Sequence, residues 1–387
     1  MSWTEPGRGP ELQPAGRPGG APASFDGGSA ERADRSAGPR LGSAELKNPF
    51  ILAPMAGLTN WPFRRLALEA GAGLTVTEMA SAAALAHRGR STQELLTTDP
   101  ELEKPFCVQL FGKDPRLMAL AAQEAVRLGA DLVDLNLACP ARKVVGSGHG
   151  GALLRDPALA QALVQAVAEA IPAPVTVKLR PGFRRQDGPT VLELGPSLAR
   201  AGAAALTLHP RYVSDRFGGQ ADWTLVTELA RRVEIPVVGS GDLTTPWLAV
   251  ERLQSSGAAA VMIGRAARGR PWIFRQCLEI LRFGRCEPAT WTERLTTAVR
   301  HARLLEAGLG PRAAFRLRTV MMWYAKGLPG AAALRAAICR LESVEAQIER
   351  LTEAIEQAQA AGWPAEPDLT ADRQTGLDGE LDVIDED

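Results

Sequence analysis

The stretch DLVDLNLACP (residues 131–140) indicates the fold, because it has the form of a buried strand followed at once by chemically active residues. Apolar side chains dominate positions 132–137, as they do in strands that are covered on both faces. Proline cannot continue a strand ladder, so the strand must end before Pro140. The sequence therefore predicts that the thiol of Cys139 stands at the open end of a buried sheet.

Seven further runs of the same kind lie between residues 50 and 265. They are FILAPM (50–55), LTVTEM (74–79), PFCVQLFG (105–112), PVTVKLR (174–180), ALTLHP (205–210), PVVGSG (236–241) and AVMIGR (260–265). Segments with helical spacing separate them, such as residues 157–171, in which Leu163, Val167 and Ile171 recur on one face. Eight alternations predict an α/β fold of the (β/α)8 TIM-barrel type over residues 45–282, with a doubly wound parallel sheet as the alternative.

The strand signal stops near residue 283, and four helical segments follow at 291–308, 311–327, 330–343 and 344–362. We expect a small all-helical domain over residues 283–363. Basic residues exceed acidic ones between positions 300 and 340, around Trp323 and Tyr324. Such a mixture suits contact with phosphates and stacking on bases, although a Trp-Tyr pair in a helix is more often part of a core.

Both ends of the chain differ from this pattern. Residues 1–44 are rich in Pro, Gly, Ala and Arg, and we expect a disordered leader there. Residues 364–387 form an acidic tail that we also expect to be disordered, with nine acidic residues against Arg373 alone. Because the whole chain has a net charge of zero, the remainder carries +8. This moderately basic body is compatible with a polyanionic partner or with an ordinary surface.

The composition also narrows the class of protein. The five cysteines include no C-x-x-C pair, so neither a disulfide framework nor a zinc site is indicated, and we expect no metal. The N-terminus lacks the apolar segment of a signal peptide, and no run of about 20 apolar residues occurs. We expect a cytoplasmic protein without a membrane segment, and a monomer.

Polar residues or glycines close each predicted strand, and in a barrel these ends meet on one face. The residues concerned are Pro54, Met55, Glu78, Gln109, Asn136, Lys178, Arg180, His209, Ser240, Gly241, Gly264 and Arg265. The turns GSGD (239–242) and IGRA (263–266) offer backbone N–H groups to a phosphate, with Arg265 beside them. Lys178 and His209 could face the electron-rich edge of a bound ring, or could be satisfied interior polar residues.

Three interpretations of Cys139 remain open on the residues alone. It could be a buried structural thiol, which is the interpretation that suits Cys107 inside its strand. It could be a nucleophile with His149 as its base. An ordinary thiol, with a pKa of about 8.5, is mostly protonated at neutral pH and can also serve as a proton donor.

Several motifs together resemble those of the tRNA-dihydrouridine synthases, and the bacterial branch in particular. They occur in the order typical of that family: APMAGLTNWPFR (53–64), DLNLACPARKV (134–144), GALLRDP (151–157), VTVKLRPGF (175–183), LTLHPRY (206–212), GGQADW (218–223), SGDL (240–243) and MIGRAARGRPWIF (262–274). The resemblance covers roughly residues 47–355.

This resemblance implies a barrel that holds FMN and a helical domain that helps to bind tRNA. NADPH would reduce the flavin, whose hydride would go to C6 of a uracil, while Cys139 as general acid would protonate C5. The residues implied to bind the cofactor are Pro54, Met55, Ala56, Gln109, Lys178, His209, Ser240, Gly241, Asp242, Gly264 and Arg265. Those implied to bind the substrate are Asn136, Arg318, Trp323, Tyr324 and Lys326.

The chain departs from the family pattern at three places. Ser240 stands where Asn is usual, and RTV (318–320) replaces an Arg-Lys-His run. Pro210 and Val213 replace a glycine and a basic residue. Two other functions stay open at this point: an FMN barrel that acts on a small molecule of the dihydroorotate or enoate type, and a non-enzymatic RNA-binding module.

Overall fold

A computed structural model describes residues 37–363. The predicted acidic tail and all but the last residues of the predicted leader lie outside the described residues. No helix within the described part is long and apolar enough to cross a membrane.

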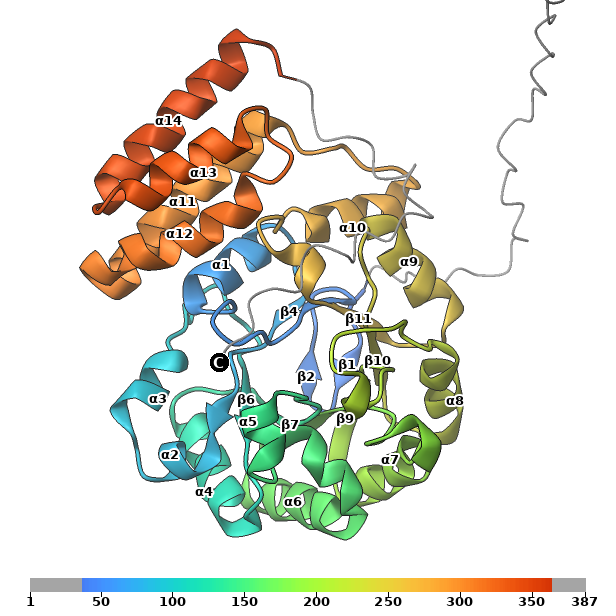
Figure 1. Cartoon of the computed structure of the whole chain (residues 1–387). Coiled ribbons are helices and arrows are strands. Elements are labelled where there is room, and N and C mark those ends of the chain that lie inside the picture. Colours follow the sequence, from blue (N-terminus) through green and yellow to red (C-terminus); the bar gives the residue numbers. More distant parts are fainter. Residues whose placement is uncertain (1–36, 364–387) are drawn as a thin grey trace, which may run out of the picture. The chain divides into compact units, whose positions relative to one another are not determined.

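A ring of parallel strands forms the centre of the molecule (Figure 1). In ring order the strands are β4 (Leu74–Thr75), β3 (Phe50–Leu52), β11 (Ala260–Ile263), β10 (Val237–Ser240), β9 (Ala203–Leu208), β8 (Val175–Leu179), β7 (Leu132–Leu137), β6 (Cys107–Phe111) and β5 (Ala80–Ser81). A parallel bridge between Val76 and Cys107 links the chain after β4 to β6 and closes the ring. The predicted TIM barrel is confirmed, and a closed ring excludes the doubly wound sheet.

One predicted strand is interrupted. Residues 74–79 were expected to form a single strand, but β4 ends at Thr75 and β5 begins only at Ala80. Between them, the backbone N–H of Gln109 donates to the side-chain Oγ1 of Thr77 (3.0 Å), which takes the place of a backbone carbonyl. The carboxylate of Glu78 accepts from the N–H of Gly57 (2.6 Å) and joins this break to the loop after β3.

Helices cover the outside of the ring, as Figure 1 shows for α4, α6, α7, α8 and α9. The barrel helices are α1 (Trp61–Glu69), α2 (Ala82–Ala86), α3 (Arg90–Leu95), α4 (Pro115–Arg127), α5 (Arg142–Gly146), α6 (Pro157–Ala170), α7 (Val191–Arg200), α8 (Thr224–Arg232), α9 (Pro246–Ser255) and α10 (Ile273–Phe283). Local sequence sets several of their starts. The side chains of Asp114, Asp156 and Thr245 each accept an N–H of the first turn, and a proline follows each of them.

The alternation of side chains along the strands creates two cores. In β7, Val133, Leu135 and Leu137 face the helices and belong to the outer core. Leu132 points into the ring, where it packs with apolar residues such as Ile51, Val76 and Val238. The interior is thus apolar at the beginning of the strands and polar at their carboxyl ends, which is where a barrel places a functional site.

A short antiparallel hairpin closes the amino-terminal end of the barrel interior. It consists of β1 (Arg40–Leu41) and β2 (Ala44–Glu45). Leu41 and the neighbouring Leu46 are buried among the interior residues of the ring. The predicted leader therefore extends too far, because residues 40–44 have an apolar partner that the sequence did not reveal.

The four helices predicted after the barrel are confirmed as α11 (Trp291–Leu309), α12 (Ala313–Tyr324), α13 (Ala331–Arg340) and α14 (Val344–Ala360). They share a core of their own, to which Trp272 from the barrel also contributes. Two contacts join α11 to α1: His301 stacks on Phe63, with ring centroids 5.7 Å apart, and Arg300 forms an ion pair with Glu69 (2.6 Å).

Candidate active site

Polar side chains on β6, β7 and β8 lie in register inside the carboxyl end of the barrel. Gln109 pairs with Asp134 across β6 and β7, and Asp134 pairs with Thr176 across β7 and β8. One pleat further along, Asn136 pairs with Lys178. Because residues two apart on a strand share a face, these five residues form one interior surface. The sequence had singled out Gln109, Asn136 and Lys178 among them.

Asn136 determines where the chain carrying Cys139 leaves β7. Its Oδ1 accepts the backbone N–H of Ala138 (3.0 Å) and that of Cys139 (2.9 Å). The carbonyl of Cys139 in turn accepts the N–H of Gly151 (3.0 Å). These bonds hold the turn that follows the strand, at the end of the barrel that the sequence predicted.

Cys139 is partly exposed, and it lies near Lys178 and Arg180 at the polar end of the interior. It is close enough to Lys178 and Arg180 for its charge to oppose, in part, the lowering of the pKa of both groups by burial. This position disagrees with a buried structural thiol. The His149 ring is engaged elsewhere, with Nδ1 2.9 Å from Ser147 Oγ and an edge-on contact to Phe111.

A cluster of basic groups surrounds this end of the barrel. The pKa of Lys178 is lowered to about 8 and that of Arg180 to about 10, mainly by burial. The positive charge of a neighbouring arginine contributes to both shifts: Arg180 beside Lys178, and Arg211 beside Arg180. The pKa of His209 is also held well below its usual value, so its ring is neutral. Burial is the main cause, and the neighbouring positive charges of Arg180, Lys178, Arg211 and Arg265 add to it.

Two buried polar atoms of this cluster lack a hydrogen-bond partner among the described residues, namely Nε of Arg180 and Nδ1 of His209. Leaving such a group unsatisfied costs about 1–3 kcal/mol. A ligand that brings hydrogen-bonding groups and negative charge would remove this cost. The donor set therefore fits a flavin that carries a phosphate.

The glycine turns after β10 and β11 lie beside this cluster. Gly241 has φ +101°, and a Cβ at this position would lie 3.3 Å from Cε1 of His209, so backbone and imidazole are in close contact. A Cβ on Gly264 would lie 3.8 Å from Sδ of Met55. The loop 54–56 and both glycine turns thus meet at the same end of the barrel.

The side chains of Ser240 and Asp242 hold these turns together. Ser240 Oγ donates to the carbonyl of Met262 (3.0 Å) on the neighbouring strand. The carboxylate of Asp242 accepts from the guanidinium of Arg211 and from the N–H of Ala221 (2.7 Å). Arg211, which the sequence analysis did not select, also donates twice to the carbonyl of Gly219. Because both side chains already have partners within the protein, we expect Ser240 and Asp242 to contact a cofactor through their backbone atoms.

The residues predicted to bind substrate in the helical domain have different surroundings. The prediction for Tyr324 is wrong, because its side chain is only 1% exposed and its hydroxyl lies 3.3 Å from Nδ1 of His301 in the core. Trp323 is half-buried with Arg268 over its ring, and Arg318 donates to the carbonyl of Leu341 (3.1 Å). Lys326 is exposed.

A different face of α12 is available to a partner. It exposes Phe315 (70%) and Met322 (48%) together with the bases Arg312 and Arg316. A Cβ placed on Gly57 would lie 3.6 Å from Nη1 of Arg316, so this face begins beside the loop after β3. The spacing of three and four residues between Arg312, Phe315 and Arg316 could have indicated this exposed face from the sequence. The indication is weak, because α12 has apolar residues on both sides and so shows no clear polar face.

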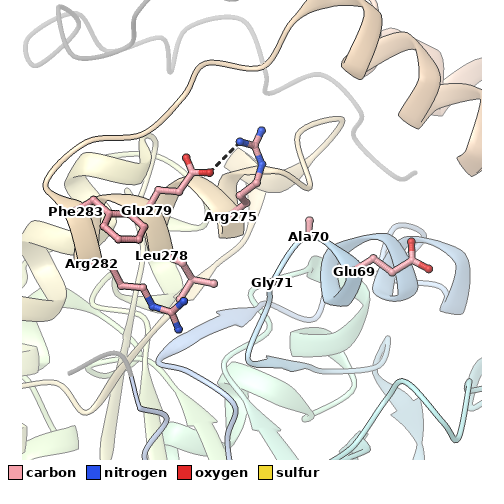
Figure 2. Close-up of a pocket in the computed structure, with 8 residues that line it drawn as sticks. All are labelled: Glu69, Ala70, Gly71, Arg275, Leu278, Glu279, Arg282 and Phe283. Atoms are coloured by element: carbon pink, nitrogen blue, oxygen red, sulfur yellow. Dashed lines mark hydrogen bonds and ion pairs between the residues drawn. The ribbon is translucent and has the colours of Figure 1, made fainter. Parts of the chain in front are cut away.

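A surface pocket elsewhere on the barrel is not part of this site. Figure 2 shows it between the end of α1 and the end of α10, lined by Glu69, Ala70, Gly71, Arg275, Leu278, Glu279, Arg282 and Phe283. Helices of a βα barrel run opposite to its strands, so these helix ends lie at the amino-terminal end of the strands. Within residues 37–363, no group of three or more His, Cys, Asp or Glu side chains is arranged to hold a metal.

Comparison with known proteins gives a consistent result. Residues 51–360 match the family model described as dihydrouridine synthase. The chain is 39% identical over 312 residues to tRNA-dihydrouridine synthase B of Pseudomonas aeruginosa, covering 80% of this chain and 93% of that protein. It is 37% identical over 322 residues to probable tRNA-dihydrouridine synthase 1 of Synechocystis sp., covering 82% of this chain and 90% of that protein.

A solved structure supports the fold alone. Histamine dehydrogenase from Rhizobium sp. 4-9 superposes with a TM-score of 0.52 at 14% sequence identity, over 84% of this chain and 65% of that chain.

Proposed function

The chain belongs to the dihydrouridine synthase family, and from this premise we propose that it reduces the C5=C6 bond of uridine in tRNA, with bound FMN as cofactor and NADPH as reductant. The observation that carries the proposal is that Cys139 lies beside the basic cluster at the carboxyl end of the barrel. A proton donor and a cluster of cations thus share the carboxyl end of the barrel.

The cofactor would lie among the basic cluster and the glycine turns. The turns at Gly241 and Gly264 offer backbone N–H groups to a phosphate, and Arg265 follows directly. Lys178, Arg180 and His209 would face the polar edge of the ring, which suits the unsatisfied Nε of Arg180 and Nδ1 of His209. Met55 beside Gly264, with Pro54 and Ala56 next to it, would contact the ring as an apolar wall.

Reduction of the double bond requires a hydride and a proton on neighbouring carbons. When bound, the reduced flavin supplies the hydride that adds to C6 of uracil. Cys139 donates its proton to C5, and the thiolate is then reprotonated from solvent. Asn136 holds the turn of Cys139 through its Oδ1, and we propose that it thereby positions the thiol toward the base. Lys178 and Arg180 stabilise the negative charge that develops on the sulfur.

The target uridine has to leave its stack to reach this cavity. Extrusion of a base costs a few kcal/mol, and least where the RNA is already irregular. We propose that the exposed face of α12, namely Arg312, Phe315, Arg316, Met322 and Lys326, contacts the tRNA around the extruded base. Cations and an aromatic ring on one face suit phosphates and unpaired bases.

The proposal is tested with the purified protein, NADPH and tRNA that lacks dihydrouridine. The protein should bind FMN, NADPH should bleach the flavin, and tRNA should restore its absorbance while dihydrouridine appears. Dihydroorotate and simple enoates serve as controls. Reoxidation by those small molecules but not by tRNA would contradict the proposal. Comparing tRNA from cells with and without the protein then identifies the modified position.

A further inference from the structure

A continuous chain of hydrogen bonds connects the buried Asp134 to the turn of Cys139. Thr176 Oγ1 donates to Oδ1 of Asp134 (2.6 Å), and Gln109 Nε2 donates to its Oδ2 (2.7 Å). Asn136 Nδ2 donates to Oε1 of Gln109 (2.8 Å). Asn136 Oδ1 then accepts the N–H of Ala138 and of Cys139. Asp134, Gln109 and Asn136 are each at most 7% exposed, so water does not replace these bonds.

The ionised carboxylate of Asp134 determines which group donates and which accepts in every later hydrogen bond of this series. An ionised carboxylate can only accept hydrogen bonds, whereas an amide donates at one end and accepts at the other. Because Asp134 accepts, Gln109 must turn its NH2 toward Asp134 and its oxygen toward Asn136. Asn136 must then turn its NH2 toward Gln109, which leaves its oxygen for the two N–H groups of the Cys139 turn.

The carboxyl of Asp134 is buried, with only 2% of the residue exposed. Burial raises the pKa of its carboxyl, and the bonds from Thr176 and Gln109 offset part of this rise by favouring the ionised form. A buried charge is costly, and an apolar residue would serve packing better at the same place. Within the barrel, Asp134 lies in register between Gln109 and Thr176, one pleat before Asn136 and Lys178.

We propose that Asp134 is a positioning residue that sets the orientation of the Gln109 and Asn136 amides and thereby fixes the turn that presents Cys139. The inference rests on the proposed role of Cys139 as proton donor. It adds Asp134 as a residue that acts on the turn of Cys139 through two intervening side chains, Gln109 and Asn136.

The substitution Asp134→Asn should reverse the chain. With its oxygen on the Thr176 hydroxyl, the new amide turns its NH2 toward the NH2 of Gln109; the opposite rotamer would require that hydroxyl to give up its acceptor and accept instead. Gln109 must rotate, which presents its NH2 to Asn136, and Asn136 must rotate in turn. The two N–H groups of the Cys139 turn then face an NH2 and lose their acceptor.

A double variant, Asp134→Asn with Gln109→Glu, should restore the original direction. The amide at 134 donates to the carboxylate at 109, whose second oxygen accepts from Asn136 as before. The variant also keeps the number of buried charges. Thr176→Val is the matched control, because it removes one bond to Asp134 and leaves the orientation of Gln109 unchanged.

The measurement is the rate at which iodoacetamide alkylates Cys139 in the flavin-loaded protein, resolved from the exposed Cys339 by mass spectrometry of peptides. We expect D134N to change this rate at least fivefold, T176V to stay within twofold of wild type, and the double variant to return to within twofold. In D134N, the tRNA-dependent reoxidation of reduced flavin should fall at least tenfold, while its reduction by NADPH stays within threefold.

An unchanged alkylation rate in D134N, an equal change in T176V, or no recovery in the double variant would each overturn the positioning role. Recovery is judged on alkylation alone, because Gln109 is itself proposed to contact the flavin. If the wild-type protein reduces no uridine, the proposed function fails, and the alkylation rates still decide whether Asp134 positions the turn.

Discussion

At the scale of single residues, two cysteines of the barrel show how surroundings decide chemistry. Cys107 points into the barrel from β6 and is fully buried. Burial, with a further contribution from Asp134, raises the pKa of its thiol well above the usual value, so it stays protonated and unreactive. Cys139 lies past the end of β7, partly exposed and beside two cations. Of these two thiols, that of Cys139 has the surroundings that suit the proton donor we propose.

The variant Cys139→Ala tests that distinction. We expect it to bind flavin and oxidise NADPH at wild-type rates, because those steps need no proton donor on the uridine side. Formation of dihydrouridine should fall by about 10²–10⁴-fold, the usual contribution of a general acid. Rapid-mixing measurements of the two flavin half-reactions, together with dihydrouridine analysis of the tRNA, check this. Full activity in the variant would contradict the role.

Lys178 gives a prediction for the pH dependence of stability. Its pKa is lowered from 10.5 to about 8, so between these values the unfolded chain binds a proton that the native protein does not. Its contribution to the free energy of unfolding therefore rises as pH increases from about 8 to 10.5, by up to about 3 kcal/mol, and is constant below that window. The stability difference between the flavin-free wild type and Lys178→Met, from urea titrations, should follow this course. A difference independent of pH would contradict it.

The residues that the sequence predicted well are those whose position follows from strand ends. Gln109, Asn136, Lys178 and His209 end predicted strands, and the geometry of a barrel brings strand ends together whatever the helices do. Tyr324 was predicted wrongly because the inner face of α12 is set by its partners, among them Trp272 from the barrel and His301 from α11. The sequence of α12 alone does not indicate that Trp272 and His301 pack against Tyr324, so its burial could not be predicted from local spacing.

At the scale of elements, a buried ion pair ties α1 to the barrel. Glu103 accepts from Nε of Arg64 (2.6 Å), from Thr75 Oγ1 (2.7 Å) and from Thr98 Oγ1 (2.6 Å), and both ionic side chains are at most 2% exposed. The carboxylate thus connects the helix, strand β4 and the loop before β6. Arg64 and Glu103 are 39 positions apart in the sequence, so this pairing could not be predicted from local spacing.

Removing one partner of a buried pair leaves the other charge uncompensated. We expect Glu103→Ala to lower the free energy of unfolding by about 3–5 kcal/mol. Glu101→Ala, which removes an exposed carboxylate two residues away, should stay within about 0.5 kcal/mol of wild type. Guanidinium titrations followed by circular dichroism measure both. Equal stability of the two variants would show that the pair contributes nothing.

At the scale of the whole molecule, the proposed site combines the carboxyl end of the barrel with α12, a helix much later in the sequence. Arg316 on α12 lies close to Gly57 in the loop after β3. In the proposed function, the barrel supplies the groups that face a base, and the helix supplies cations and an aromatic ring beside the loop after β3. Recognition of a folded RNA and chemistry on one of its bases are thereby divided between the two parts.

This division predicts a separation of kinetic constants. The double variant Phe315→Ala with Arg316→Ala should raise the KM for tRNA about tenfold or more and leave kcat within threefold, because it loses a stacking contact and a phosphate contact outside the cavity. Reduction of the flavin by NADPH should be unchanged. Arg282→Ala, at the other end of the barrel, is the control and should leave KM unaltered. A fall in kcat with constant KM would contradict the assignment.

The hairpin formed by β1 and β2 has a practical consequence for anyone who shortens this chain. The span shared with the family starts at residue 51, and a version trimmed to that span would omit Leu41 and Leu46. Ile51, Leu74 and Leu132 would then meet water at the floor of the barrel. Two fully buried leucines contribute about 3–6 kcal/mol, so such a fragment should melt at a lower temperature and aggregate more readily than one that begins at residue 37. A poor yield of the trimmed fragment would then result from exposure of apolar residues at the amino-terminal end of the barrel. It would say nothing about the chemistry at the carboxyl end.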